Sequence, residues 1–511
     1  MKVVIQRPMA QRNRQIDPQI HKPSDVQCEA LWDNALFEVR LRPVDGIFQA
    51  FFIDDLKDLE VSLERDQSAY PILHKGFFDS HLHSIWMSLM KKDFDASIFE
   101  SFEDLTEGLL NFSRQNRGAS FLRGFNWDES RFGMSLQEIT QKSAEIFSHI
   151  PVPTAVYRVC GHSALCNEKF LAAIGMPGHS SLVTDTHLEK VHRFFPPPSL
   201  EELQSAFLKS QAELLNLGIT SIGEMSVDIS MIEALIKICE SGQLLIDVQA
   251  CFDATKGDWL EKNGPQVFTN SKPIGPLDRP AEFQVKHWKK YLDGSFGSRS
   301  AWLTQNYLDH EAFGESLVST AQLMEEASEA LKKGFYLSFH CIGDAALDQA
   351  LEVGDRLAEL CKDRIRVDSN LQNVSSYHRL EHAQLIRDDQ LERMKRQNLW
   401  TLCVQSGHRV ADQNFIKNRL GSERSFKQAY RAGSFLDFNL RFALGSDAPI
   451  DKPHPYHVLK SAMNHPNPVE ALSFSEAMWF YTTGARRNLG MTSGTVKKSS
   501  TVFLTHFEDL K

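Results

Sequence analysis

Short apolar runs alternate with stretches in which apolar residues recur three and four positions apart, over most of the chain from residue 200 onward. Runs of the first kind predict strands, and stretches of the second kind predict amphipathic helices. The predicted strands are 72–78, 154–159, 219–223, 244–252, 283–292, 335–340, 377–382, 399–405 and 440–446. The predicted helices are 96–115, 136–150, 200–217, 231–239, 320–333 and 345–361. This alternation of strands and helices indicates a parallel sheet with helical cover.

Nine predicted strands are one more than a closed (β/α)8 TIM barrel holds. We therefore place strand 154–159 in an insertion after the first barrel strand, at about residues 90–200. The predicted fold class is α/β, a (β/α)8 TIM barrel with this insertion and a small accessory β unit built from the two chain ends. The expected parts are a polar N-terminal arm at 1–27, the accessory β unit at 28–70 plus 486–511, and the barrel at 71–485.

The composition narrows the class of protein and of partner. The 511 residues are 42% hydrophobic and 24% charged, which suits a soluble globular protein with a large core. A formal net charge of −10 argues against nucleic acid or an anionic membrane as the main partner. The polar N-terminus lacks the apolar segment of a signal peptide, and the eight cysteines form no C-x-x-C pair. We expect a cytoplasmic protein with reduced cysteines that acts on a small molecule, and a homodimer is compatible with the sequence.

His81 and His83 are the first candidate metal ligands, two residues apart at the end of a predicted strand. Residues i and i+2 of a strand point to the same side, about 6.5–7 Å apart, so both imidazoles can bind one cation. The alternative is that they are ordinary surface or hydrogen-bonded histidines.

Further polar residues stand at the ends of later strands: Lys289, His340, His382 and Asp447. In a parallel barrel the carboxyl ends of the strands meet at one rim, where barrel enzymes place their chemistry. Imidazole and carboxylate ligands together suit Zn²⁺ or a similar divalent ion. The order of these residues therefore predicts a metal site at that rim.

Five phrases resemble the amidohydrolase superfamily, and within it the family 3 branch that includes N-substituted formamide deformylases. They are FFDSHLH at 77–83, KKYLDGSFGSR at 289–299, HCIGD at 340–344, RLEHAQ at 379–384 and GSDAP at 445–449. The resemblance extends from about residue 71 to about residue 491. Each phrase alone is weakly specific, but five in this order are a strong signal.

The resemblance implies a barrel that holds one or two divalent metal ions, with Zn²⁺ the favoured ion. The implied ligands are His81, His83, Lys289, His340, His382 and Asp447. Lys289 would bridge both ions as a carbamate derived from CO₂, because a lysine ammonium repels cations and a carbamate does not. The metal would activate a water that attacks the substrate carbonyl, and Asp447 would serve as the general base.

Each implied ligand has a structural alternative. Lys289 adjoins Lys290, so one of the two is open to being a solvated surface charge. His340 and His382 would alternatively be hydrogen-bonded barrel histidines, and Asp447 would be the N-cap of a following helix.

Five more residues are candidates for supporting roles. His162 and Trp127 lie in phrases similar to the same branch and would bind substrate; the alternatives are a structural histidine and core packing. Asp79, Asp293 and Asp344 lie near predicted ligands and would orient them, although loop turns also favour Asp.

The sequence thus predicts a metal-dependent amidohydrolase that cleaves a non-peptide C–N bond of the N-substituted amide or formamide type. Two alternatives stay open: the same metal-binding barrel with another hydrolase or isomerase chemistry, and a non-catalytic regulatory or binding protein. The substrate itself cannot be read from the sequence.

Overall fold

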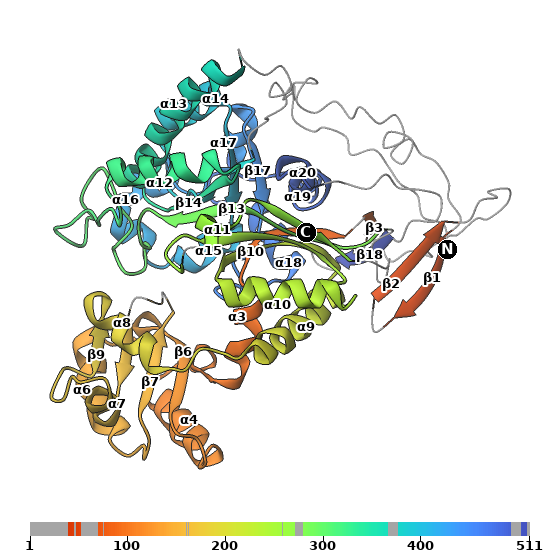
Figure 1. Ribbon diagram of the computed structural model, residues 1–511. Coiled ribbons are helices and arrows are strands. Elements are labelled where there is room, and N and C mark those ends of the chain that lie inside the picture. Colours follow the sequence, from red (N-terminus) through yellow and green to blue (C-terminus); the bar gives the residue numbers. More distant parts are fainter. Residues whose placement is uncertain are drawn as a thin grey trace. The chain divides into compact units, whose positions relative to one another are not determined.

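The computed structural model describes residues 39–44, 47–52, 70–74, 76–159, 161, 163–257, 259–270, 279–365, 377–491 and 502–507. The chain divides into two compact units (Figure 1), which are Met1–Ser84 with Leu208–Lys511, and Ile85–Phe207. The two boundaries fall in α3 (Ser84–Leu89) and α9 (Leu200–Asn216). The predicted N-terminal arm lies outside the described residues.

Eight parallel strands form the barrel of the first unit. In order they are β4 (Phe77–Leu82), β10 (Ile219–Val227), β11 (Asp247–Asp253), β13 (Glu282–Tyr291), β14 (Tyr336–Cys341), β15 (His378–His382), β16 (Trp400–Val404) and β17 (Arg441–Leu444). A short strand, β12 (Gln266–Thr269), pairs antiparallel with β13. The ring is nearly closed between the ends of β17 and β4, where the Asp447 backbone N–H donates to the His81 carbonyl at 2.7 Å. The predicted (β/α)8 TIM-barrel fold is therefore confirmed.

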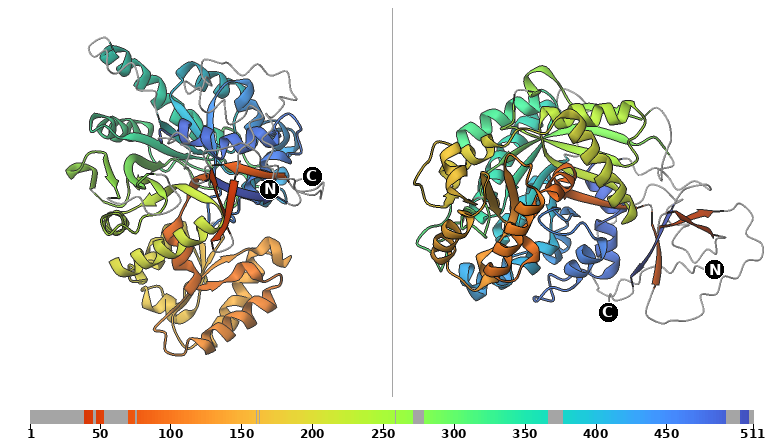
Figure 2. Two further views of the ribbon diagram at one scale, coloured as in Figure 1. Left: turned by 90° about the vertical axis from the view of Figure 1, so that its right-hand side faces the viewer. Right: turned by 90° about the horizontal axis from the view of Figure 1, so that it is seen from below.

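Helices surround this ring in Figures 1 and 2. They are α10 (Ile229–Glu240), α11 (Trp259–Lys262), α12 (Thr320–Lys332), α13 (Asp344–Ile365), α14 (Asp388–Gln397), α15 (Ser406–Asp412), α16 (Ile416–Lys427), α17 (Ala432–Asp437), α18 (Pro455–Met463), α19 (Phe474–Phe480) and α20 (Thr483–Asn488). The Asp228 side chain caps α10 by accepting from the Met231 N–H at 2.8 Å. In the described part of the chain, no helix combines the length and the apolar composition that crossing a membrane requires.

The predicted strand 72–78 is wrong in its bounds, because the structure divides it between two sheets. β3 (Tyr70–His74) joins an antiparallel sheet with β1 (Val39–Val44), β2 (Ile47–Phe52) and β18 (Val502–Phe507), whereas β4 begins the barrel at Phe77. Gly76 has φ +95°, and a Cβ there would lie 2.1 Å from Thr220 Oγ1. Only glycine fits this turn, and hydrophobicity alone does not reveal the break.

The first residues of the predicted C-terminal accessory segment, 486–491, pack on the barrel. The buried Arg486 guanidinium donates to the Gly76 carbonyl at 3.1 Å and to Thr220 Oγ1 at 2.7 Å. Leu489 lies in an apolar cluster with Phe78 of β4. The barrel therefore extends beyond residue 485, and β18 belongs to the separate four-stranded sheet.

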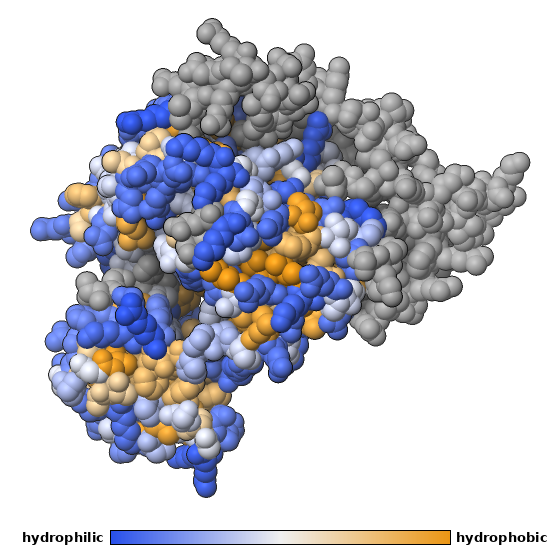
Figure 3. All heavy atoms as spheres, in the orientation of Figure 1, coloured by the Kyte–Doolittle hydropathy of each residue, from blue (hydrophilic) through white to orange (hydrophobic). Residues whose placement is uncertain are grey.

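The second unit contains a five-stranded sheet and its own core. Its strands are β5 (Phe94–Asp95), β6 (Leu122–Trp127), β7 (Thr154–Arg158), β8 (Ser163–Cys166) and β9 (Leu182–Thr184). Its helices are α4 (Phe102–Gln115), α5 (Glu129–Phe132), α6 (Leu136–Phe147), α7 (Glu168–Ala173) and α8 (Asp185–Phe194), with short 3₁₀ turns at Met90–Lys92 and Ala96–Ile98. The predicted strand 154–159, one more than the barrel holds, thus lies in this unit as β7. On the face shown in Figure 3, blue hydrophilic and orange hydrophobic residues lie side by side in both units.

Candidate metal centre

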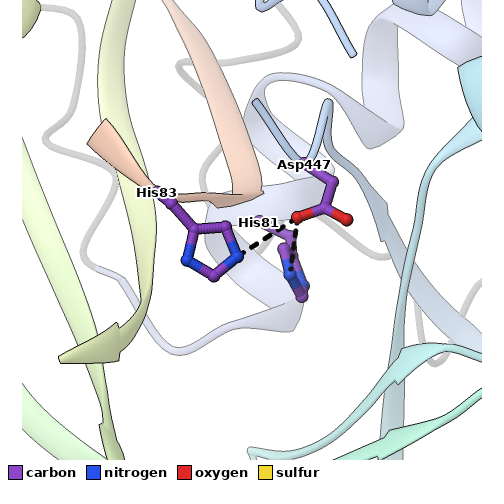
Figure 4. Close-up of side chains that lie close together, drawn as sticks. All are labelled: His81, His83 and Asp447. Atoms are coloured by element: carbon purple, nitrogen blue, oxygen red, sulfur yellow. Dashed lines mark ion pairs between the residues drawn. The ribbon is translucent and has the colours of Figure 1, made fainter. Parts of the chain in front are cut away.

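His81, His83 and Asp447 converge at the closure of the barrel (Figure 4). His81 lies in β4, His83 follows directly, and Asp447 lies in the loop after β17. Asp447 Oδ1 is 3.2 Å from His81 Nε2 and 3.3 Å from His83 Nε2. Reciprocal backbone hydrogen bonds, Asp447 N–H to the His81 carbonyl and His83 N–H to the Ala448 carbonyl, each at 2.7 Å, hold the three side chains together.

The other oxygen of Asp447 belongs to a second group of potential ligands. The ligand atoms of His382, His408 and Asp447 lie within 4.8 Å of one another, and His408 Nε2 is 3.4 Å from Asp447 Oδ2. His382 ends β15 and His408 lies on α15. Both Asp447 and His382 have left-handed backbone conformations, with φ +59° and +71°. Such conformations cost about 1–3 kcal/mol each and concentrate at functional sites.

The donor atoms at this point fit a divalent metal. His81 Nε2 and Asp447 Oδ1 are buried and have no hydrogen-bond partner among the described residues. Leaving such groups unsatisfied costs about 1–3 kcal/mol each, so native structures rarely do so without a compensating ligand. Imidazole nitrogens and a carboxylate oxygen are the donors that Zn²⁺ takes in proteins.

Two of the imidazoles are held with one nitrogen free. His81 Nδ1 lies 2.6 Å from Glu381 Oε2, and because an ionised carboxylate only accepts, His81 donates from Nδ1; the neutral ring then has its lone pair on Nε2. His382 Nδ1 lies 2.8 Å from the amide oxygen of Gln405, which gives the same result. A partner that fixes the tautomer in this way is the usual companion of a metal-binding histidine.

Glu381 is the centre of a buried network beneath His81. Arg379 Nε donates to Glu381 Oε1 at 2.6 Å and Ser338 Oγ donates to the same oxygen at 2.8 Å, while Arg379 Nη1 donates to Gln249 Oε1 at 2.9 Å. Burial alone would raise the pKa of Glu381, but the charge of Arg379 and the hydrogen bond from His81 outweigh it and hold this pKa well below the ordinary range. Sequence reasoning missed Glu381, although opposite charges two residues apart in an apolar strand were a signal.

The carboxylate of Asp447 has a similar balance. Burial by itself would raise its pKa, yet the facing His81 and His83 imidazoles lower the pKa of Asp447 well below the usual value. Asp447 is therefore ionised at neutral pH, which both metal binding and proton acceptance require. His408, the second partner of this carboxylate, was also missed, although it follows the predicted strand 399–405 at the carboxyl end.

Lys289 lies on β13 and is 1% exposed. Its Nζ is 4.9 Å from the centroid of the Tyr291 ring. Burial alone would lower the pKa of Lys289, but Tyr291, Glu381 and Asp447 together raise this pKa above the ordinary value. The neighbouring Lys290 instead donates to Glu326 Oε2 at 2.6 Å, so it is Lys290 that forms an ordinary ion pair.

His340 lies near the end of β14, beside His382, with 4.6 Å between the ring centroids. Its Nε2 donates to the Gly294 carbonyl at 3.2 Å, which leaves Nδ1 with a lone pair. Burial and the charge of Lys289 lower the pKa of His340 to about 3, so the ring is neutral. Neither compact ligand group among the described residues includes His340.

Asp79 supports the backbone of the site rather than an imidazole. Its carboxylate accepts from the Ser446 N–H at 2.9 Å, the His81 N–H at 3.3 Å and the Tyr481 hydroxyl at 3.2 Å. Burial raises the pKa of Asp79 to about 6, against these hydrogen bonds. Asp79 thus contacts His81 through its backbone N–H, whereas Glu381 holds the imidazole ring.

Asp293 and Asp344 hold loops at the same rim. The Asp293 carboxylate accepts from the Gly343 N–H at 2.8 Å, and its Oδ1 lies 3.7 Å from His340 Nε2, beyond hydrogen-bond reach. Burial raises the pKa of Asp293 to about 7. Asp344 accepts from the Thr304 N–H at 3.0 Å. Both carboxylates thus accept from backbone N–H groups of segments distant in sequence and hold them at the rim.

Of the two predicted substrate contacts, the structure describes Trp127, which lies in the second unit. Trp127 is fully buried, packs in a core cluster with Phe102 and Phe147, and donates from its indole N–H to the Val156 carbonyl at 2.9 Å. The structure therefore supports core packing for Trp127. His162 lies outside the described residues.

Known proteins resemble this chain over most of its length. Protein LONG AFTER FAR-RED 3 of Arabidopsis thaliana is 25% identical over 84% of this chain and 75% of its own. YtcJ of Bacillus subtilis is 25% identical over 81% and 79% of the two chains. N-substituted formamide deformylase of Arthrobacter pascens is 20% identical over 80% and 77%.

A solved structure and a family profile show which family the chain belongs to. The crystal structure of an uncharacterized metal-dependent hydrolase from Pyrococcus furiosus matches with a TM-score of 0.63 and 26% identity, over 82% of this chain and 83% of that one. The profile of the Amidohydrolase family matches residues 76–499. The chain therefore belongs to the Amidohydrolase family, as its five motifs predicted.

Proposed function

We propose that this protein is a metal-dependent hydrolase that cleaves a non-peptide C–N bond, with an N-substituted amide or formamide as substrate. The observation that carries the proposal is the buried pair of His81 Nε2 and Asp447 Oδ1, two potential metal-ligand atoms that have no hydrogen-bond partner among the described residues. Membership of the family supports hydrolysis, and the resemblance to a formamide deformylase supports the bond type.

The ligands would be His81, His83, Lys289, His340, His382 and Asp447. A divalent ion bound there would polarise the substrate carbonyl and make a neighbouring water more acidic. Asp447, ionised at neutral pH, would accept the proton of that water and pass it to the departing amine nitrogen. The bond broken joins the carbonyl carbon to nitrogen, and the products are a carboxylic acid and an amine. His81 and Glu381 are fully buried, so bulk water does not reach either side chain.

Lys289 would enter the site as a carbamate, which forms when its neutral amine adds CO₂ and releases a proton. Without a metal the neighbouring acidic groups favour the ammonium form. A divalent cation beside Lys289 would repel that ammonium and favour the neutral amine. We therefore expect carbamate formation at Lys289 to be coupled to binding of the metal ion on the β13–β14 side.

Elemental analysis after growth with Zn²⁺, followed by a panel of N-formyl and N-acyl amines, tests the proposal. We expect about one or two metal ions per chain and release of amine from at least one member of the panel. A chain with less than about 0.5 metal ions would contradict metal-dependent hydrolysis. A metal-loaded protein that cleaves no amide, yet cleaves esters or isomerises a substrate, would instead support the alternative hydrolase or isomerase chemistry.

A further inference from the structure

His408 is held in the opposite way to the histidines beside it. Its Nδ1 lies 2.9 Å from the side-chain amide nitrogen of Gln384. An amide nitrogen donates and does not accept, so Nδ1 of His408 is the acceptor. Because Nδ1 accepts, it carries no proton, and the proton of the His408 ring is on Nε2, the atom 3.4 Å from Asp447 Oδ2.

His408 differs from His81 and His382 in which ring nitrogen carries the proton. Those rings donate from Nδ1 to the oxygens of Glu381 and Gln405 and present a lone pair on Nε2. His408 presents an N–H from the same ring position. A ring with Nε2–H cannot bind a metal through that atom, but it can donate to a carboxylate.

We propose that His408 is a positioning residue and not a metal ligand: its Nε2–H, fixed by Gln384, holds Oδ2 of Asp447 and thereby turns Oδ1 toward His81 and His83. The inference rests on the proposed function, in which Asp447 is the proton acceptor. His408 and Gln384 are 9% and 5% exposed, so bulk water scarcely competes for this contact. The 3.4 Å separation is long for a hydrogen bond, and such contacts commonly shorten when a site is loaded.

Titration of the metal-free protein with Co²⁺, followed by its visible absorption, separates a ligand from a positioning residue. We compare His408→Leu, which removes the donor, with His408→Gln, whose amide N–H restores one. The control His382→Gln removes a proposed ligand, and His454→Gln controls for loss of a histidine elsewhere. We expect His408→Leu to weaken Co²⁺ binding by about tenfold, and His408→Gln to recover most of that loss.

The absorption spectrum at saturating Co²⁺ distinguishes a metal ligand from a positioning residue. We expect an unchanged band shape in both His408 variants and in His454→Gln, because the ligand set is intact, and a changed shape in His382→Gln. A changed spectrum in both His408→Leu and His408→Gln, with no recovery of affinity in the latter, would show that His408 is a ligand and overturn the inference.

The tautomer is measured independently of metal and substrate. In metal-free protein labelled with ¹⁵N-histidine, the signals lost in His408→Gln belong to His408 and should have the shifts of an Nε2–H ring. In Gln384→Glu the new carboxylate accepts from Nδ1, so the same signals should shift toward Nδ1 protonation. Nδ1–H shifts in the wild-type protein would overturn the inference. Failure of the wild-type protein to bind Co²⁺ would instead contradict the proposed function and leave the tautomer result standing.

Discussion

The two halves of the site differ in how completely the fold assembles them. On the β4–β17 side, backbone hydrogen bonds across the barrel closure bring the imidazoles of His81 and His83 within 3.3 Å of Asp447 Oδ1. On the β13–β14 side, the buried Lys289 amine faces an aromatic ring, and His340 lies outside both compact ligand groups of the described chain. The first half is ready to bind a cation as it stands, whereas the second requires a chemical change at Lys289.

Removing the carboxylate that both halves share should have the largest effect. We expect Asp447→Asn to lower kcat by about 10³-fold or more, because an amide cannot accept the proton of the attacking water. Metal content should fall far less, since the histidines of both halves stay in place. The measurement is steady-state kinetics with elemental analysis, and the matched control is the exposed Asp389→Asn. A kcat equal to that of the control would remove Asp447 from the role of base.

Glu381→Gln should lower both the stability of the protein and the metal affinity of the β4–β17 half of the site. The substitution leaves Arg379 buried without its counter-charge, which costs about 3–5 kcal/mol of the free energy of unfolding. It should also weaken Zn²⁺ binding by about 10–100-fold, because the His81 tautomer is no longer fixed by a carboxylate. Denaturant unfolding and competition with a chromogenic chelator measure the two effects. Unchanged values for both would show that the network beneath His81 is dispensable.

Lys289→Ala should impair the β13–β14 half of the site and leave the β4–β17 half intact. We expect this variant to keep the metal of the β4–β17 side and to lose activity by about 10²-fold, with partial recovery when a short carboxylic acid such as acetate is added to replace the carbamate. Lys290→Ala is the matched control and should behave as the wild-type protein, since Lys290 pairs with Glu326. Equal losses in both variants, without recovery by acetate, would contradict a carbamate at Lys289.

The smallest effect concerns His378, a buried histidine outside both ligand groups. Burial lowers the pKa of His378 to about 4, while its unfolded pKa is about 6.5. Between these values the unfolded chain binds the extra proton, so stability is full above pH ~6.5 and falls as the pH drops toward 4. The contribution is at most about 1.4 kcal/mol per pH unit.

His378→Gln should flatten this slope, because glutamine does not titrate and can still accept from the Leu337 N–H that His378 Nδ1 now binds at 3.0 Å. The free energy of unfolding measured at several pH values between 4 and 7 checks it, with the slope compared rather than the absolute stability. A slope equal to that of the wild-type protein would show that His378 is not the titrating group.

The sequence determined the eight-strand barrel, the insertion and the family, because strand and helix periodicity reflects local backbone geometry and the five phrases occur in a fixed order. It also placed His81, His83, His382 and Asp447 at strand ends that share one rim. All four meet there: His81 and His83 lie with Asp447 in one group, and His382 lies with Asp447 in the other.

Only the tertiary structure decided how each polar group is used. Glu381 holds His81 across 300 positions of the chain, and Gln384 sets the tautomer of His408 from a different element. Trp127 is a core residue because of the packing around it. These roles depend on hydrogen-bond partners and packing that are distant in sequence, and periodicity carries no information about either.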